Sequence, residues 1–281
     1  MDMKKLLLLS AIAALTFSSC SMEGTKSSRI DFRIKAITVE GKGIYSDATD
    51  QISFTYDDDG RVQRYLCQFE VSDAPYGIRY AISGNEVNVY RDGNRKLTGL
   101  LNSGMLQTLE EDGGSSTFSY LADDRLNGAT EDWGWNPETS DYESSNTDDF
   151  LWDENGCLVS YRQISSGGAT SELTFQYPSG AGKNPFASLA VDPLAILASR
   201  FVNNDFCVLH MICGMTGARS ASFPNSITQT LYDEENSPFS EEHYDISLSG
   251  ADANGYPMFI SMGNDYQIYT FTIEYEGELP Q

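Results

Sequence analysis

Histidine, cysteine and positive charge are scarce in this 281-residue sequence, and each scarcity excludes a class of site. The two histidines and five cysteines stand at spacings that match no zinc site and no disulfide framework. Two scattered histidines also leave no basis for a Ser-His-Asp triad, and no G-x-S-x-G motif occurs. We therefore expect no metal and no cofactor, and the residues do not indicate an enzyme.

The charge balance is strongly one-sided. Eighteen lysines and arginines face 41 aspartates and glutamates, which gives a formal net charge of −23. A surface this acidic repels phosphate backbones and anionic head groups, so we expect no nucleic acid partner. Cations or neutral ligands such as sugars remain possible partners. The alternative is that the charge only keeps a secreted protein in solution.

A long hydrophobic run is also missing, except for a short one at the N-terminus. Lys4 and Lys5 precede an apolar stretch at 6–15, which is too short to span a bilayer but suits a secretory signal. "FSSC" at 17–20 follows and resembles a bacterial lipobox, in which the cysteine becomes the lipidated N-terminus. The sequence predicts a signal peptide at 1–19 and a membrane anchor at Cys20, because several acyl chains hold a protein stably.

Small polar residues at 20–30 predict a lipidated flexible tether. The remaining residues, 31–281, are expected to form a single β-rich domain. Loss of residues 1–19 removes two lysines and one aspartate, so the charge of −23 becomes −24. The four cysteines of the domain are expected to be buried free thiols: Cys67, Cys157, Cys207 and Cys213.

Most of the domain consists of short segments in which apolar and polar residues alternate, separated by turns that contain glycine. "FTYDDDGRVQRY" at 54–65 is one example. A calcium loop counted from Gly60 would need an acidic ligand at Thr55 and a glutamate at Leu66, so the triple aspartate instead predicts a hairpin turn. The repetition predicts a mainly β protein, an antiparallel meander of hairpins that forms a large curved sheet.

One segment departs from this pattern. Residues 185–217 are apolar and poor in alternation, and Asp192 before Pro193 suits the start of a helix. Two short helices, at about 192–201 and 205–213, are expected to pack on one face or one end of the sheet. By contrast, 266–276 alternates apolar and polar residues and predicts a strand with one buried face.

Several short motifs carry a resemblance. Tyr56-Asp57 before Gly60 and Trp152-Asp153 before Gly156 resemble the Tyr-Asp repeat of Rhs-type proteins. Together with "NPFASL" and "FPNSIT", they make the chain similar, over about 36–275, to uncharacterised Bacteroidetes outer-membrane lipoproteins with a domain of unknown function. The resemblance implies a cell-envelope location, in the outer membrane, and does not name an activity.

The aromatic residues of 132–152 are the candidate ligand-binding residues: Trp133, Trp135, Tyr142 and Trp152. Trp133 and Trp135 would share one face of an extended strand, and sugar rings stack on such surfaces while carboxylates and amides bind their hydroxyls. The alternative is that these rings pack against the sheet as cross-strand pairs.

The sequence thus predicts a lipid-anchored cell-envelope binding protein, with a glycan as the candidate ligand. One alternative is a structural or assembly component of the outer membrane with a protein partner. A second is a glycoside hydrolase, since such enzymes use paired carboxylates and acidic pairs are abundant. These pairs are Glu110-Glu111, Asp148-Asp149 and Glu241-Glu242.

Overall fold

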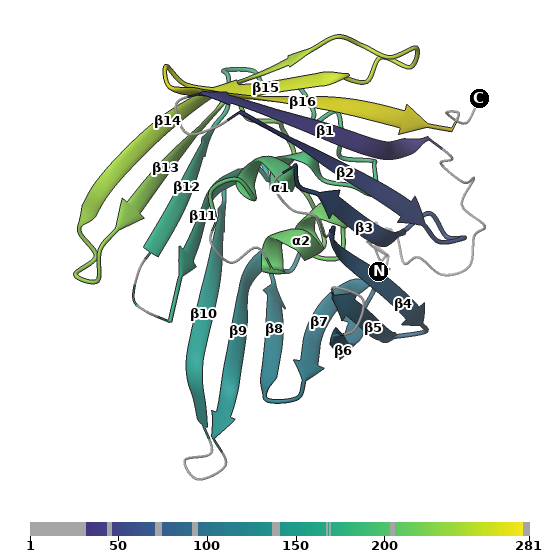
Figure 1. Cartoon of the computed structure of the whole chain (residues 1–281), viewed down its shortest axis with the longest axis vertical. Coiled ribbons are helices and arrows are strands. Elements are labelled where there is room, and N and C mark those ends of the chain that lie inside the picture. The colour runs from purple at the N-terminus through teal and green to yellow at the C-terminus, as the bar shows by residue number, and fades with distance from the viewer. Residues whose placement is uncertain are drawn as a thin grey trace, which may run out of the picture.

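The protein folds into one closed antiparallel β-barrel (Figure 1). The computed structural model describes residues 32–43, 47–70, 75–91, 95–136, 141–166, 168, 170–202 and 206–277, within which sixteen strands follow one another around the barrel in chain order. They are β1 (Arg33–Gly43), β2 (Ala48–Tyr56), β3 (Val62–Gln68), β4 (Tyr76–Ser83), β5 (Glu86–Arg91), β6 (Arg95–Asn102), β7 (Met105–Glu111), β8 (Gly114–Tyr120), β9 (Leu126–Asn136), β10 (Asp141–Trp152), β11 (Leu158–Ile164), β12 (Thr170–Gln176), β13 (Ser226–Tyr232), β14 (Pro238–Ser249), β15 (Phe259–Gly263) and β16 (Gln267–Glu276).

The expectation of a mainly β antiparallel fold is confirmed, but the sheet is closed rather than only curved. β1 pairs with β16 over most of its length, and the first pair joins Arg33 to Glu276. The Nε atom of Arg33 lies 2.7 Å from Oε1 of Glu276, which adds an ion pair at this seam. Closure leaves no unpaired edge strand in the barrel.

Alternation along the strands separates an apolar interior from a polar exterior. In β2, Ile52 and Phe54 are buried whereas Gln51, Ser53 and Thr55 are exposed. In β16 the predicted alternation is confirmed, since Phe271 and Ile273 are buried inside the barrel. Apolar burial, at roughly 25 cal/mol per Å², stabilises the wall from within.

The predicted hairpin tip at 57–60 is confirmed, and the same turn recurs. The amide of Asp57 bonds the carbonyl of Arg61, that of Gly60 bonds the carbonyl of Asp57, and the Asp57 side chain accepts from Asp59 and Arg61 amides. Turns with the same backbone bonds start at Leu121, Asp153, Asp233 and Asp252. Their fourth residues all have a positive φ: Gly60, Asp124, Gly156, Asn236 and Gly255.

At one end of the barrel, tyrosine and tryptophan side chains donate hydrogen bonds to backbone carbonyls of neighbouring strands. Each lies near the end of an even-numbered strand and donates to a carbonyl near the start of the preceding strand. The pairs are Tyr56 with Ile34, Tyr120 with Leu106, Trp152 with Leu126, Tyr177 with Leu158, and Tyr275 with Pro257. Phe32 stacks on Tyr275 here, with ring centroids 5.1 Å apart. We call this the proximal end, and the opposite one the distal end.

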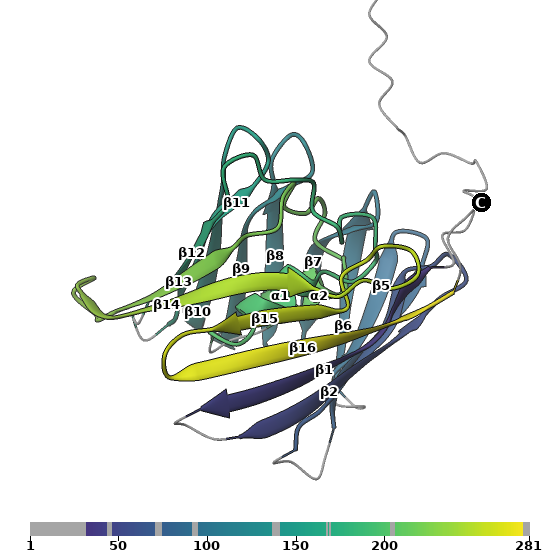
Figure 2. The ribbon, with the colours of Figure 1, turned by 90° about the horizontal axis from the view of Figure 1, so that it is seen from above.

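The chain between β12 and β13 fills the barrel. Its helices, α1 (Pro193–Ala198) and α2 (Phe206–Ile212), are near the expected positions, and the Asp192 side chain caps α1 by accepting from the Leu194 amide at 3.0 Å. Every residue of α1 is buried. Both helices lie inside the barrel (Figures 1 and 2), so the face on which they pack is the inner face of the sheet, and the sheet closes around them.

Backbone bonds tie this insert to the proximal turns. The amide of Ala218 bonds the carbonyl of Asp124, that of Ala221 bonds the carbonyl of Gly156, and that of Leu106 bonds the carbonyl of Met215. The four cysteines of the domain are buried free thiols, as expected. Among the described residues, no helix has the length and apolarity to cross a bilayer.

Candidate functional site

The predicted aromatic residues lie on β9 and β10, whose hairpin extends past its neighbours at the distal end (Figure 1). β8 pairs with β9 only as far as Trp133, and β11 pairs with β10 only as far as Thr147. Beyond these residues β9 and β10 pair with each other, up to Asn136 with Asp141. The end of this hairpin therefore extends beyond the strands on either side of it.

Gly134 changes the geometry that the sequence predicts for Trp133 and Trp135. Its φ of +75° interrupts the extended backbone, and both the Gly134 and Trp135 amides point at the carbonyl of Gly113, at 2.9 and 3.3 Å. This positive φ departs from the extended backbone on which the predicted shared face depends, while the register with β10 keeps Ser144 opposite Trp133 and Tyr142 opposite Trp135. Trp135 is 47% exposed, whereas Trp133 is only partly exposed. Trp135 is thus the ring best placed to meet a ligand.

The other two predicted residues are far apart. Tyr142 pairs with Trp135 in the strand register, and its side chain lies outside the described residues. Trp152 lies at the proximal end of the same strand. Ten residues of strand separate them, which corresponds to about 33 Å. The structure therefore brings Trp133, Trp135 and Tyr142 to one hairpin but does not bring Trp152 there.

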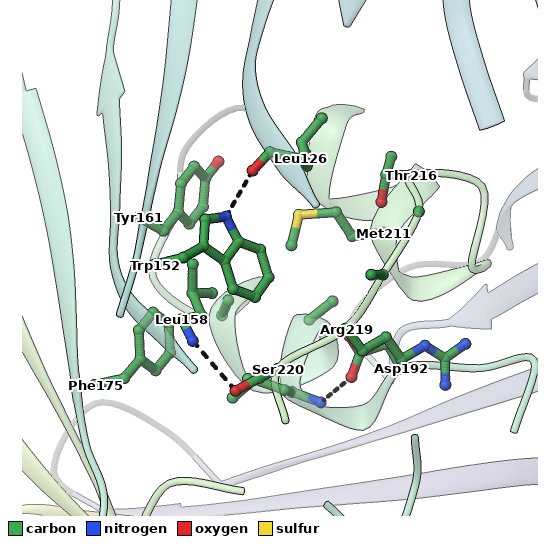
Figure 3. Close-up of a pocket in the computed structure, with 15 residues that line it drawn as sticks. Leu126, Trp152, Leu158, Tyr161, Phe175, Asp192, Met211, Thr216, Arg219 and Ser220 are labelled. Atoms are coloured by element: carbon green, nitrogen blue, oxygen red, sulfur yellow. Dashed lines mark hydrogen bonds between the residues drawn. The ribbon is translucent and has the colours of Figure 1, made fainter. Parts of the chain in front are cut away.

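Trp152 borders a small cavity between the insert and the barrel wall (Figure 3). Its Nε1 atom donates to the carbonyl of Leu126 at 2.7 Å, and Met211 and Leu158 lie around the same space. The cavity volume is about 20 Å³, which accommodates about one water molecule. A sugar ring does not fit there, so the cavity is a packing feature of the core.

Near the distal ends of β11 and β12, the inner wall carries polar residues instead of apolar ones. They form what we call the inner polar patch: Ser116, Glu131, Asn146, Asp148, Gln163 and Ser171. The strand register places them side by side, with Asp148 opposite Gln163 and Gln163 opposite Ser171 in one row. Glu131 lies opposite both Ser116 and Asn146 in the adjacent row.

Asp148 is the most perturbed group of this patch. Only 4% of its surface is exposed, and Oδ1 accepts hydrogen bonds from Tyr161 at 2.8 Å and Gln163 at 3.2 Å. Burial raises the pKa of Asp148 to about 6, although both hydrogen bonds favour the charged form. The nearby charge of Glu131 raises it further. This carboxyl therefore exchanges its proton in the weakly acidic range.

Sequence reasoning missed the inner polar patch. In the sequence Asp148 stands out only as half of an acidic pair with Asp149, and in the structure Asp148 is buried whereas Asp149 is exposed. The signal was present in the alternation of β10, where Asn146 and Asp148 share the parity of buried Phe150. Ser171 adds a buried hydroxyl with no hydrogen-bond partner among the described residues. Among those residues, no group of three or more His, Cys, Asp or Glu could hold a metal ion.

Comparison with known proteins gives a likeness of fold. No family model and no curated protein matches the chain. Among solved structures, it is similar to a porin-like protein from Bacteroides uniformis, with a TM-score of 0.63 and 15% identity over 86% of this chain and 98% of that one. A porin-like protein from Bacteroides vulgatus has a TM-score of 0.55 and 10% identity, over 88% and 100%.

The shared property is the barrel. At 15% and 10% identity, such likeness shows the architecture alone and transfers no site or activity. The resemblance to lipoproteins with a Tyr-Asp repeat remains a prediction from the sequence.

Proposed function

We propose that this protein is a lipid-anchored binding protein of the cell envelope, built on a filled barrel. The observation that carries the proposal is the apolar interior: the barrel encloses α1, whose six residues are all buried, and leaves about 20 Å³ at the cavity near Trp152. A conducting pore needs a wide polar lumen instead. The barrel therefore acts as a scaffold that presents its surface.

The polarity of the strands supports the same proposal. A barrel wall embedded in lipid carries an apolar outer band and a polar interior. Here the relation is reversed, as Gln51, Ser53 and Thr55 face outward from β2 while Ile52 and Phe54 face inward. Attachment to the membrane would then depend on the lipid predicted at Cys20, which lies outside the described residues.

An anchor at Cys20 also gives the barrel an orientation. The described chain begins at Phe32, which packs at the proximal end against Tyr275. The tether at 20–30 would therefore join the membrane to the proximal end, and the β9–β10 hairpin would be turned away from the membrane. We propose that Trp135 on this hairpin stacks on a sugar ring, with nearby polar groups taking its hydroxyls.

A glycan-array screen with a matched pair of variants tests the ligand. Trp135→Ala should abolish glycan binding and leave the melting temperature almost unchanged, because Trp135 is 47% exposed. Phe239→Ala is the control, since Phe239 is a ring of 66% exposure on the β13–β14 hairpin. If no glycan binds, the result would contradict glycan binding and favour the alternative, an assembly component with a protein partner.

The hydrolase alternative is less favoured by the geometry. Asp148 has the raised pKa that a general acid needs, but its 4% exposure keeps it from a substrate.

The predicted lipid anchor has its own test. Metabolic labelling with palmitate should tag the wild-type protein. Label that persists in Cys20→Ala would contradict lipidation at this residue.

A further inference from the structure

Among the described residues, several cations form ion pairs with carboxylates, as expected where acids are in excess. Ion pairs join Lys35 to Glu274, Arg61 to Asp57 and Arg200 to Asp50, for example. Other described cations, such as Lys42 and Lys183, make no ion pair either, and what distinguishes Arg64, Arg79 and Lys96 is that they stand in one row of the sheet. Among the described residues, no ion pair connects any of these three to a carboxylate.

The strand register brings these three cations together. Arg64 on β3 lies opposite Arg79 on β4, Arg79 lies opposite Tyr90 on β5, and Tyr90 lies opposite Lys96 on β6. We call this set the cationic row. Arg64, Arg79 and Lys96 are exposed on the outer wall, while their chain neighbours Tyr65, Tyr80 and Leu97 are buried inside. β3 to β6 lie side by side in Figure 1.

This arrangement costs stability. Like charges directly opposite each other on neighbouring strands repel, as Arg64 and Arg79 do here. The chain has 41 acidic residues that could have neutralised the row, and yet the positions contain only cations and a tyrosine. A repulsive arrangement that folding does not require points to a ligand of opposite charge.

Tyr90 holds the centre of the row in place. The Cζ atom of Arg79 lies 3.9 Å from the centroid of the Tyr90 ring, which is a close cation–π contact. A guanidinium fixed in this way retains its N–H donors for a carboxylate or sulfate.

Uncharged residues flank the cationic row on the outer wall. They are Leu66 and Gly77 on one side, and Ala81, Asn88 and Thr98 on the other. The nearest acidic residue in the register on that second side is Glu110, opposite Thr98.

We propose that the cationic row binds a linear anionic polysaccharide through its carboxylate or sulfate groups. The row is one residue wide and crosses four strands, about 14 Å at a strand spacing of about 4.8 Å. A single extended chain fits this shape, whereas a flat anionic bilayer would also meet the acidic surface around the row. Nucleic acid fits less well, because a strand places a charge about every 3.4 Å and the net charge of −23 repels so dense a polyanion.

Binding of the purified protein to dextran sulfate and to polygalacturonate, with neutral dextran as the reference, tests the proposal. Arg64→Gln/Arg79→Gln should bind both polyanions at least tenfold more weakly. Lys42→Gln/Lys183→Gln removes the same charge from exposed cations outside the row and should bind like the wild type. Circular dichroism checks that the variants fold. If the double arginine variant does not fold, Lys96→Glu replaces it and should weaken binding at least threefold.

Several outcomes would overturn the proposal. These are no binding by the wild type, equal loss in the two double variants, or binding to single-stranded DNA or phosphatidylglycerol vesicles that is as tight as binding to the polysaccharides. The site is separate from the proposed contact at Trp135. Trp135→Ala should therefore leave polyanion binding unchanged, so that failure here and failure of the glycan contact on the hairpin can be told apart.

Discussion

The hydroxyl of Tyr161 donates a 2.8 Å hydrogen bond to Oδ1 of Asp148 inside the barrel. The acceptor is a buried carboxylate that forms no ion pair with the described residues, so only hydrogen bonds offset its loss of solvation. Its protonation state is therefore linked to folding.

Asp148→Asn should raise stability at neutral pH. The folded pKa of about 6 lies above the unfolded value of 3.8, so the folded state binds the proton more tightly and gains stability as pH falls from 6 towards 4. Above pH 6 the buried charge costs up to about 3 kcal/mol, which Asn avoids while its amide oxygen still accepts from Tyr161. Urea unfolding at pH 7.5 and pH 4 measures the difference, which should shrink at pH 4. Asp149→Asn, on the outer face, is the control, and a less stable Asp148→Asn at pH 7.5 would contradict the interpretation.

His210 should give the opposite pH dependence. It is fully buried, its Nδ1 atom lies 2.7 Å from the Tyr80 hydroxyl, and burial lowers the pKa of His210 to about 3. The unfolded state therefore takes up a proton below pH 6.5 that the folded state does not, and stability is lost as pH falls. The loss at pH 5 is about 2 kcal/mol. His210→Gln should remove this loss of stability between pH 7 and pH 5, and His243→Gln, at an exposed histidine, should retain it. Equal slopes in both variants would show that another group is responsible.

The repeated turn predicts a pair of substitutions with opposite signs. Asp124 has a φ of +65° where the equivalent residues Gly60, Gly156 and Gly255 have +80° to +84°. Asp124→Gly should stabilise the protein by about 0.5–1 kcal/mol, and Gly156→Ala should destabilise it by about 1 kcal/mol, because a Cβ disfavours this conformation. Thermal melting measures both changes. Gly182→Ala, at an open site without a positive φ, is the control and should change the melting temperature little.

Trp152 and Trp135 should differ in their effect on stability. Trp152→Ala removes a ring that packs on the core and donates to Leu126, so we expect a cost of about 3 kcal/mol. Trp135→Ala should cost less than about 0.5 kcal/mol, as is usual at exposed positions. Chemical denaturation of the two variants measures both values. A large loss for Trp135→Ala would assign this ring to packing and remove it from the candidate site.

Local patterns were sufficient to predict the strands, the turns and the helix start. The alternation in 266–276 predicts β16, the DDDG segment predicts the turn after β2, and Asp192-Pro193 predicts the start of α1. Each depends on residues a few positions apart. The shared face of Trp133 and Trp135 was a local prediction too, and it did not allow for the positive φ at Gly134.

What the sequence by itself determined is the set of strands and turns, because side-chain alternation and turn preferences act between near neighbours. Only the tertiary structure decided that β1 meets β16, where Arg33 and Glu276 are 243 residues apart, and that the apolar insert is enclosed by the barrel. It also decided the two polar features of the wall. The inner polar patch and the cationic row each combine residues from several strands, and their meeting depends on the register between strands, which no single strand encodes.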